Sequence, residues 1–150
     1  MYAHMKLVID RSHLIKALGH VQSVVEKRGT IPILSNVKME AAGDVLYLTA
    51  TDMDIAVKER VNATVSEPGL STVPAHTLYD IVRKLPDGSQ VEISRAEDSA
   101  KAVIRSGTSR FSLATLPVDE FPVMSEGDMP FTFSLAAAEI NALIDKTRFA

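Results

Sequence analysis

The sequence predicts an α+β domain in which two helices lie on one face of antiparallel sheet. The first observation is a pattern that recurs at residues 7–18, 71–82 and 133–144 and joins a short β-prone stretch to aliphatic residues at helical intervals. The second is that three short segments follow each of the first two copies, and polar and apolar residues alternate within them. Such alternation is typical of antiparallel strands with one covered face.

Each of the first two copies begins a unit of strand, helix and three strands. Asp10 is suited to opening the first helix and Pro74 the second. The three following strands are expected at residues 37–40, 45–51 and 55–58 in the first unit, and at residues 91–94, 102–105 and 110–113 in the second. Turn-forming residues separate them. Two such units together form one α+β layer arrangement.

The third copy of the pattern stops soon after its helix, and its expected strands are missing. A stretch rich in proline and acidic residues precedes it and is typical of an interdomain linker. We therefore expect one complete domain at residues 5–125, with repeats at about 5–65 and 66–117. Residues 126–150 would be the end of the linker and the truncated start of a second domain, and residues 1–4 a tag or N-terminal extension.

The composition fits a cytoplasmic globular protein. Of the 150 residues, 46% are hydrophobic and 23% are charged, which allows a sizeable core. The absence of cysteine excludes disulfides, thiolate zinc sites, iron–sulfur clusters and cysteine nucleophiles. No apolar run is long enough to cross a membrane. The net charge of −3 argues against a protein that is basic overall.

Positive charge is concentrated in the first helix and the loop after it. Residues 11–28 carry a net charge of +3, so the rest of the chain is strongly acidic. Helical spacing places Lys16 on a polar stripe with Ser12 and His20, opposite an apolar stripe that includes Leu14 and Leu18. The apolar stripe would pack on the sheet and leave the polar stripe exposed. In the second helix Asp80 offsets Arg83 and Lys84, so that helix is less cationic.

A set of segments between Met5 and Ala150 occurs in a distinctive order and spacing: residues 31–36, 48–54, 71–75 and 81–86, and above all residues 109–117 followed by 119–122. Together they resemble the N-terminal part of the bacterial sliding clamp family, the beta subunits of DNA polymerase III. This resemblance implies the DNA-clamp fold, built from units like those inferred above. It also implies a non-catalytic role, in which two subunits of the complete protein close head to tail around duplex DNA and tether the replicative polymerase.

The resemblance also implies two groups of site residues. The first would contact DNA phosphates weakly and without sequence preference: Arg28, Lys16, Arg11, His76, Arg83 and Lys84. The second would lie at the dimer interface: Arg105, Arg110, Phe111 and Leu113. For the cations the alternative is a solvated helix face or loop, and for Phe111 and Leu113 it is the domain's own core.

The resemblance implies that the partner edge of the dimer interface lies in a later domain of the full-length proteins of the family, which this sequence lacks. It implies the same for most of the pocket where polymerase and clamp loader dock. We therefore expect the 150-residue chain to be monomeric. A different class of protein remains open, namely a free-standing interaction module that has a clamp-like domain, uses the edge around Phe111 and has no role on DNA.

An enzyme is the remaining alternative, and the sequence offers little for it. We find no phosphate-binding glycine-rich loop, no serine elbow and no pair of histidines at metal-ligand spacing. Asp52 and Asp54 could ligate a hard cation. Their neighbours favour a turn between two strands, in which an aspartate bonds to nearby backbone. The sequence therefore predicts no catalytic residue, no metal and no cofactor.

Overall fold

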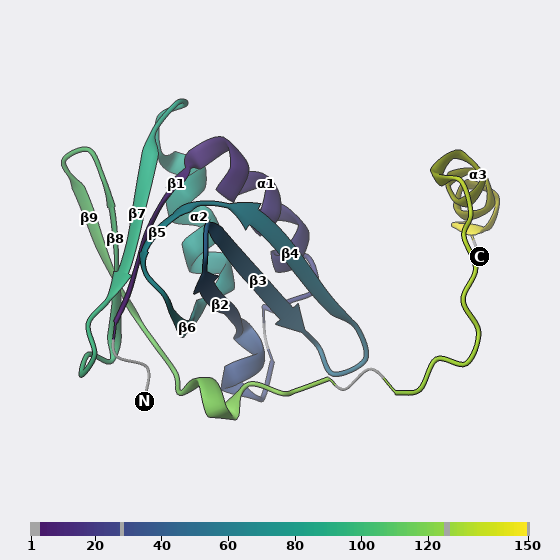
Figure 1. The fold of residues 1–150 in the computed structure, drawn as a ribbon, viewed down its shortest axis with the longest axis horizontal. Coiled ribbons are helices and arrows are strands. Elements are labelled where there is room, and N and C mark those ends of the chain that lie inside the picture. Colours follow the sequence, from purple (N-terminus) through teal and green to yellow (C-terminus); the bar gives the residue numbers. More distant parts are fainter. Residues whose placement is uncertain (1–3, 28, 125–126, 150) are drawn as a thin grey trace.

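The strands form two antiparallel sheets, which together with the helices confirm the predicted α+β fold (Figure 1). The computed structural model describes residues 4–27, 29–124 and 127–149. The first sheet has the order β5-β1-β7-β8-β9, with β5 at Thr64–Glu67, β1 at Met5–Asp10, β7 at Gln90–Arg95, β8 at Lys101–Ser106 and β9 at Ser109–Ala114. The second has the order β4-β3-β2-β6, with β4 at Ala56–Asn62, β3 at Val45–Thr51, β2 at Asn36–Ala42 and β6 at Gly69–Pro74.

The two sequence repeats exchange their first strands. Strand β1 opens the first repeat but pairs with β7 of the second, in a register that places Leu7 opposite Ile93. Strand β6 opens the second repeat but pairs with β2 of the first, with Val37 opposite Val73. Each sheet therefore contains strands of both repeats, and neither repeat can complete its sheet alone.

Strand β5 was not predicted. It follows β4 after a single residue, Ala63, yet it pairs with β1 in the other sheet. The backbone N–H of Ala63 donates a hydrogen bond to the Asp44 carbonyl, which holds the crossing in place. The chain therefore passes directly from one sheet to the other.

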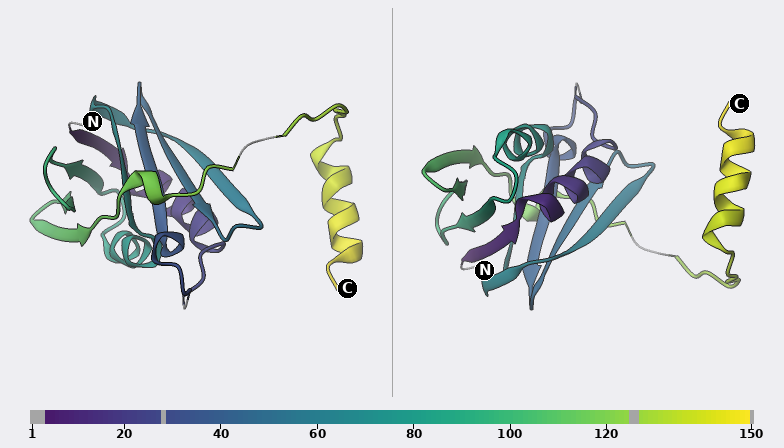
Figure 2. Two further views of the ribbon diagram at one scale, coloured as in Figure 1. Left: turned by 90° about the horizontal axis from the view of Figure 1, so that it is seen from below. Right: turned by 90° about the horizontal axis from the view of Figure 1, so that it is seen from above.

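Two helices lie side by side next to the sheets (Figures 1 and 2). Helix α1 spans Arg11–Gln22 and helix α2 spans Ala75–Lys84, so both begin where the sequence indicated. Asp10 stands at the N-cap of α1 but makes no side-chain cap bond. Its carboxylate instead accepts a hydrogen bond from the Gln90 amide on the paired strand β7.

The core lies between the helices and the inner faces of both sheets. Leu14 and Leu18 of α1 and Leu78 and Val82 of α2 are completely buried, as the helical periodicity predicted. From the sheets, the inward positions at every second residue meet them. These include Leu7, Ile9, Met39, Leu46, Leu48, Ile93 and Ile104.

Residues 123–124 and 127–149 form no core of their own, because all of them are exposed. Two short 3-10 helices, η1 at Pro32–Ser35 and η2 at Val118–Glu120, flank the sheets. The third copy of the pattern forms helix α3, Ala137–Thr147, which stands apart from the sheets and has no buried residue (Figure 1). Within residues 4–27, 29–124 and 127–149, no helix has both the length and the apolar character needed to cross a membrane.

Two leucine truncations test this division. Leu14 is fully buried in α1, whereas Leu143 is 57% exposed in α3. We expect Leu14→Ala to lower the free energy of unfolding by about 2–5 kcal/mol, because it removes buried methyl groups and leaves a cavity. Leu143→Ala serves as the matched control and should stay within about 0.5 kcal/mol of the wild type. Urea denaturation followed by circular dichroism measures both values, and equal losses would contradict the assigned core.

Candidate nucleic-acid interface and strand edge

Helix α1 presents its polar stripe to solvent. Ser12, Lys16 and His20 are exposed, while Leu14 and Val21 on the other side are buried. The separation follows from the 3.6-residue period of the helix, since apolar residues at intervals of three and four share one face. Lys16 therefore carries a cation on the outside of the helix pair.

Arg11 has a structural position at the first turn of α1. Its guanidinium donates from Nε to the Val82 carbonyl at 3.0 Å and from Nη2 to the Arg83 carbonyl at 2.9 Å, and Nη1 pairs with Asp87 at 2.9 Å. Carbonyls in the last turn of a helix lack intrahelical partners and carry partial negative charge, so a cation there stabilises the helix end. The Arg11 side chain is 15% exposed.

His76 makes the reciprocal contact at the first turn of α2. Its Nε2 lies 2.9 Å from the carbonyl oxygen of Val25, just beyond α1. Since a carbonyl only accepts, Nε2 carries the proton and donates it. The two helices are therefore antiparallel, and each N-terminal turn is bonded to the end of the other helix. Arg11 and His76 were both expected to contact DNA, but these donors form hydrogen bonds inside the domain.

Helix α2 offers a small cationic surface, as the offset of its basic residues by Asp80 indicated. Arg83 is exposed, but its Nη2 lies 3.1 Å from the Asp80 carboxylate and its guanidinium stacks near the Tyr79 ring. Lys84 is also exposed, and within the described part of the chain no carboxylate lies within ion-pair distance of it. Arg28, the remaining expected DNA contact, lies outside the described residues.

Glu59 is a charged neighbour of α1 that the sequence reasoning missed. Its carboxylate lies 2.6 Å from His20 Nδ1. The alternation of β4 contained the signal, because Val57, Glu59 and Val61 share the face that turns toward the helix. An acid at this position lowers the positive potential around Lys16, which lines the same hollow.

Strand β9 is an outer strand of its sheet, and Phe111 lies exposed upon it. It pairs with β8 only, so the described residues leave its outer backbone edge without a partner strand. Phe111 is 36% exposed and lines a shallow hollow with Ile81, Lys84 and Pro86 of α2 and the loop after it. An exposed strand edge of this kind can accept another strand.

The expected interface residues divide between the surface and the core. Leu113 was expected at a dimer interface, but it is 7% exposed and belongs to the domain's own core, because its side chain turns inward beside Ala102. Arg105 and Arg110 are exposed and stand directly opposite each other on β8 and β9. Like charges at opposed positions repel, and Glu92 compensates only Arg105, at 3.9 Å.

Asp52 and Asp54 lie in the turn between β3 and β4, which is held by hydrogen bonds from backbone N–H groups. Asp52 accepts hydrogen bonds from the backbone N–H of Asp54 at 2.9 Å and of Ile55 at 2.7 Å, while Met53 adopts φ of 82°. The residues the structure describes contain no group of three or more side chains that could hold a metal ion. The arrangement agrees with the turn that the sequence favoured.

This turn makes a prediction about pH. The N–H groups of Ile55 and then Asp54 stabilise the ionised carboxylate and hold the pKa of Asp52 below its ordinary value of 3.8. The stabilisation is present above 3.8 and is lost as the pH falls through the lower pKa of the folded state. We expect a carbon-detected NMR titration to place the midpoint below 3.8 in the folded chain and near 3.8 in urea. The difference in thermal midpoint between wild type and Asp52→Ala should shrink over the same acidic range, and a constant difference would contradict this account.

Comparisons with known proteins give a consistent result. The family model described as the DNA polymerase III beta subunit, N-terminal domain, matches residues 5–125. The Beta sliding clamp of Caulobacter vibrioides is 53% identical over 146 residues, covering 97% of this chain and 39% of that protein. That of Escherichia coli is 37% identical over 147 residues, with 97% and 40% covered.

Solved structures of such proteins have the same fold. A Caulobacter crescentus beta sliding clamp matches with a TM-score of 0.95 and 51% identity, covering all of this chain and 40% of that one. A Pseudomonas aeruginosa sliding clamp matches with a TM-score of 0.93 and 40% identity, with 99% and 40% covered. The chain thus spans about 40% of the length of these relatives.

Proposed function

The chain belongs to the DNA polymerase III beta subunit family, and we propose that it supplies the first domain of a sliding clamp, a non-catalytic processivity factor. In the complete protein, two subunits would close head to tail around duplex DNA and hold the replicative polymerase on it. The observation that carries the proposal is the antiparallel helix pair, which presents Lys16 and Lys84 to solvent while Arg11 and His76 are bonded inside the domain. Residues 5–125 would be this domain, and residues 126–150 the linker and the start of the next.

The small number of available cations suits a protein that slides. Contacts to phosphates carry no sequence information, and each one adds affinity by releasing counterions. Lys16 and Lys84, together with Arg28 on the strength of the family resemblance, would supply a weak attraction that falls with salt. A ring retains DNA by enclosing it, so strong contacts are unnecessary and would impede movement.

The β9 edge would join a second subunit. Phe111 supplies an exposed apolar side chain beside the open edge. On the opposite face of the same strands Arg105 and Arg110 supply positive charge, of which Glu92 compensates only that of Arg105. An acidic, apolar edge of a partner subunit complements both features. That edge, like the docking sites for polymerase and clamp loader, would lie in parts of the full protein beyond residues 1–150.

The exposed Phe111 edge also supports one alternative. A free-standing interaction module with no role on DNA would use the same edge and would be indifferent to the cations on the helices. Binding of DNA therefore distinguishes the two functions.

Charge reversal on the helices tests the DNA-facing surface. We expect the chain to bind a 20-base-pair duplex weakly at 20 mM salt, with affinity that falls as salt rises. Lys16→Glu combined with Lys84→Glu should weaken binding at least tenfold, because it replaces attraction to phosphates with repulsion. Fluorescence anisotropy of labelled duplexes of two unrelated sequences gives both the affinity and its independence of sequence.

The matched control is Lys101→Glu paired with Lys58→Glu, which makes the same change in net charge at exposed positions on the strands. These substitutions should alter affinity by less than threefold. An equal loss in both double variants would mean that only net charge matters, and no loss in either would remove Lys16 and Lys84 from the proposal.

The open edge makes a prediction about association. We expect light scattering at 50 μM to give a mass near 16.3 kDa, because in this proposal the complementary edge would lie outside this chain. Phe111→Asp should leave that mass unchanged and raise the concentration at which the chain begins to aggregate, since it removes an exposed apolar side chain. A stable dimer that Phe111→Asp leaves intact would place self-association on another surface.

A further inference from the structure

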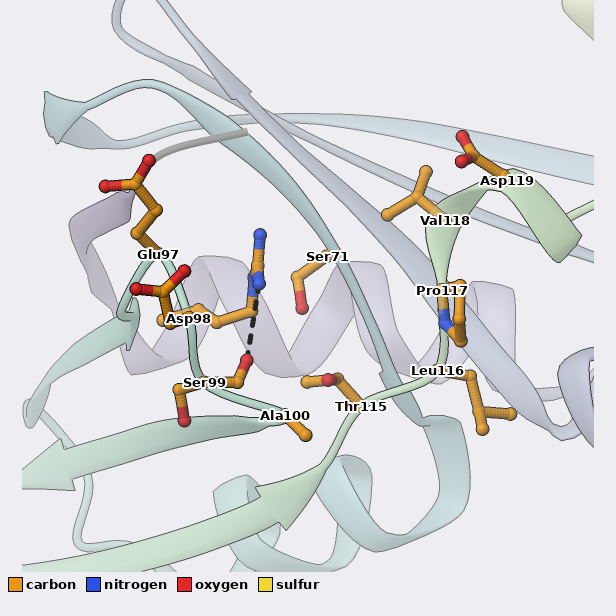
Figure 3. A pocket seen from close by; sticks show the side chains of 11 residues that line it. Ser71, Glu97, Asp98, Ser99, Ala100, Thr115, Leu116, Pro117, Val118 and Asp119 are labelled. Atoms are coloured by element: carbon orange, nitrogen blue, oxygen red, sulfur yellow. Dashed lines mark hydrogen bonds between the residues drawn. The ribbon is translucent and has the colours of Figure 1, made fainter. Parts of the chain in front are cut away.

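A pocket that none of the proposed DNA or dimer residues enters lies between the β7–β8 turn and the segment leading from β9 to η2 (Figure 3). Its volume is about 410 Å³, which is within the range of pockets that hold ligands. The lining residues are Ser71 of β6, Arg95 of β7, residues 97–100 of the turn and residues 115–119 of the following segment.

Ser71 places an unpartnered hydroxyl at this pocket. The residue is 1% exposed, and its Oγ has no hydrogen-bond partner among the residues that the structure describes. It stands opposite Met39 in the register of β6 and β2, and Figure 3 shows its side chain among the residues that line the pocket. A buried hydroxyl without a partner lowers stability, because no hydrogen bond offsets the loss of its contact with water. A ligand that accepts its hydrogen bond would remove this cost.

The opening of the pocket is acidic. Figure 3 places Glu97 and Asp98 on one side, Asp119 on the other and Ser71 between them. All three carboxylates are on exposed residues. The Arg95 guanidinium holds the turn by donating from Nη1 to the Ser99 carbonyl at 3.3 Å. The lining therefore has a net charge of −2, which disfavours an anionic ligand.

One wall of the pocket is apolar. Leu116, Pro117 and Val118 form it, and Leu116 is fixed because its backbone N–H and carbonyl both bond the Thr72 hydroxyl. Such a wall accepts methylene groups, which long basic side chains provide while keeping their charge in water. Apolar side chains offer no ligand atoms to a metal ion, and the described residues form no metal-binding group.

We propose that this pocket binds an extended basic peptide segment of a partner protein. A lysine or arginine stem would lie along Leu116, Pro117 and Val118, its charge would meet the carboxylates of Asp98 and Asp119, and a main-chain carbonyl of the peptide would accept from Ser71 Oγ. The site is separate from the helix pair and from the β9 edge, so it stands whether or not the chain contacts DNA.

The experiment uses the 15N-labelled chain and two synthetic probes, acetyl-Leu-Lys-Leu-Lys-amide and the same peptide with glutamate in place of lysine. We expect the lysine peptide to shift the amide signals of Ser71, Ser99 and Thr115 saturably, and the glutamate peptide to leave them unchanged. Spermidine tests charge alone. If spermidine binds as tightly as the lysine peptide with the same shifts, the acidic rim acts without the hydroxyl or the apolar wall, and the proposal is overturned.

Two substitutions and a control locate the binding. Ser71→Ala and Asp119→Asn should each weaken the lysine peptide about fivefold, the effect of one lost hydrogen bond or charge contact. Asp44→Asn, in the exposed turn between β2 and β3, makes the same change as Asp119→Asn and should have no effect. Equal affinity in wild type and all three variants, or shifts confined to the helices, would overturn the proposal.

Ser71→Ala also reports on the free chain. Because the hydroxyl has no partner there, its removal should leave the thermal midpoint unchanged or raise it. A lower midpoint would mean that the hydroxyl is already bonded within the free domain, for example through an enclosed water molecule, and that result would overturn its role as a ligand donor.

Discussion

The exchange of first strands between the two repeats is the constraint on which the rest of this structure depends. Because β1 completes the sheet of the second repeat and β6 completes that of the first, each helix follows a strand that lies in the other repeat's sheet. The helices run antiparallel, and each N-terminal turn meets the end of the other. Arg11 and His76 fix this arrangement through backbone carbonyls at Val82, Arg83 and Val25. The orientation of every exposed cation on the helices follows from it.

The same constraint decides which polar groups remain for ligands. Arg11 would look like a phosphate contact in any count of basic residues, but its donors satisfy the carbonyls at the end of α2, where a helix cannot satisfy them itself. In the described part of the chain, Lys16 and Lys84 do not bond helix-end carbonyls in this way, and their side chains are exposed to water. An attraction limited to few charges is what the proposed sliding along DNA would require. The fold and the weakness of the proposed DNA contact thus have one cause.

Local sequence patterns predicted most of the helices and strands, but they did not predict which strands pair. The helices beginning at Arg11 and Ala75 were predictable because helical periodicity and the residues opening a helix are local signals. Strand β5 was missed because Thr64–Glu67 contains one apolar residue, Val65, and follows β4 almost directly. The division into two sheets could not be inferred, since a strand's sequence defines its faces and leaves its partner open.

The surroundings of the site residues could likewise be predicted only where the signal was local in the sequence. Lys16 could be placed outside from its stripe alone, whereas the partners of Arg11 lie more than 70 residues away in sequence. Phe111 and Leu113 share one face of β9, so alternation could not separate them. Leu113 lies further along the strand, inside the core, while Phe111 lies nearer the exposed loop after α2.

The distribution of charge gives this domain two surfaces with opposite preferences. Lys16 and Lys84 lie on the helices, whereas Glu97, Asp98 and Asp119 surround the pocket at the β7–β8 turn. A polyanion is attracted to the first surface and repelled by the second, and a basic peptide has the reverse preference. A basic partner segment would therefore be repelled from the helices by the same charges that we propose attract DNA. Because the two ligands do not compete for one surface, a partner could stay bound at the pocket while the helix pair faces duplex DNA.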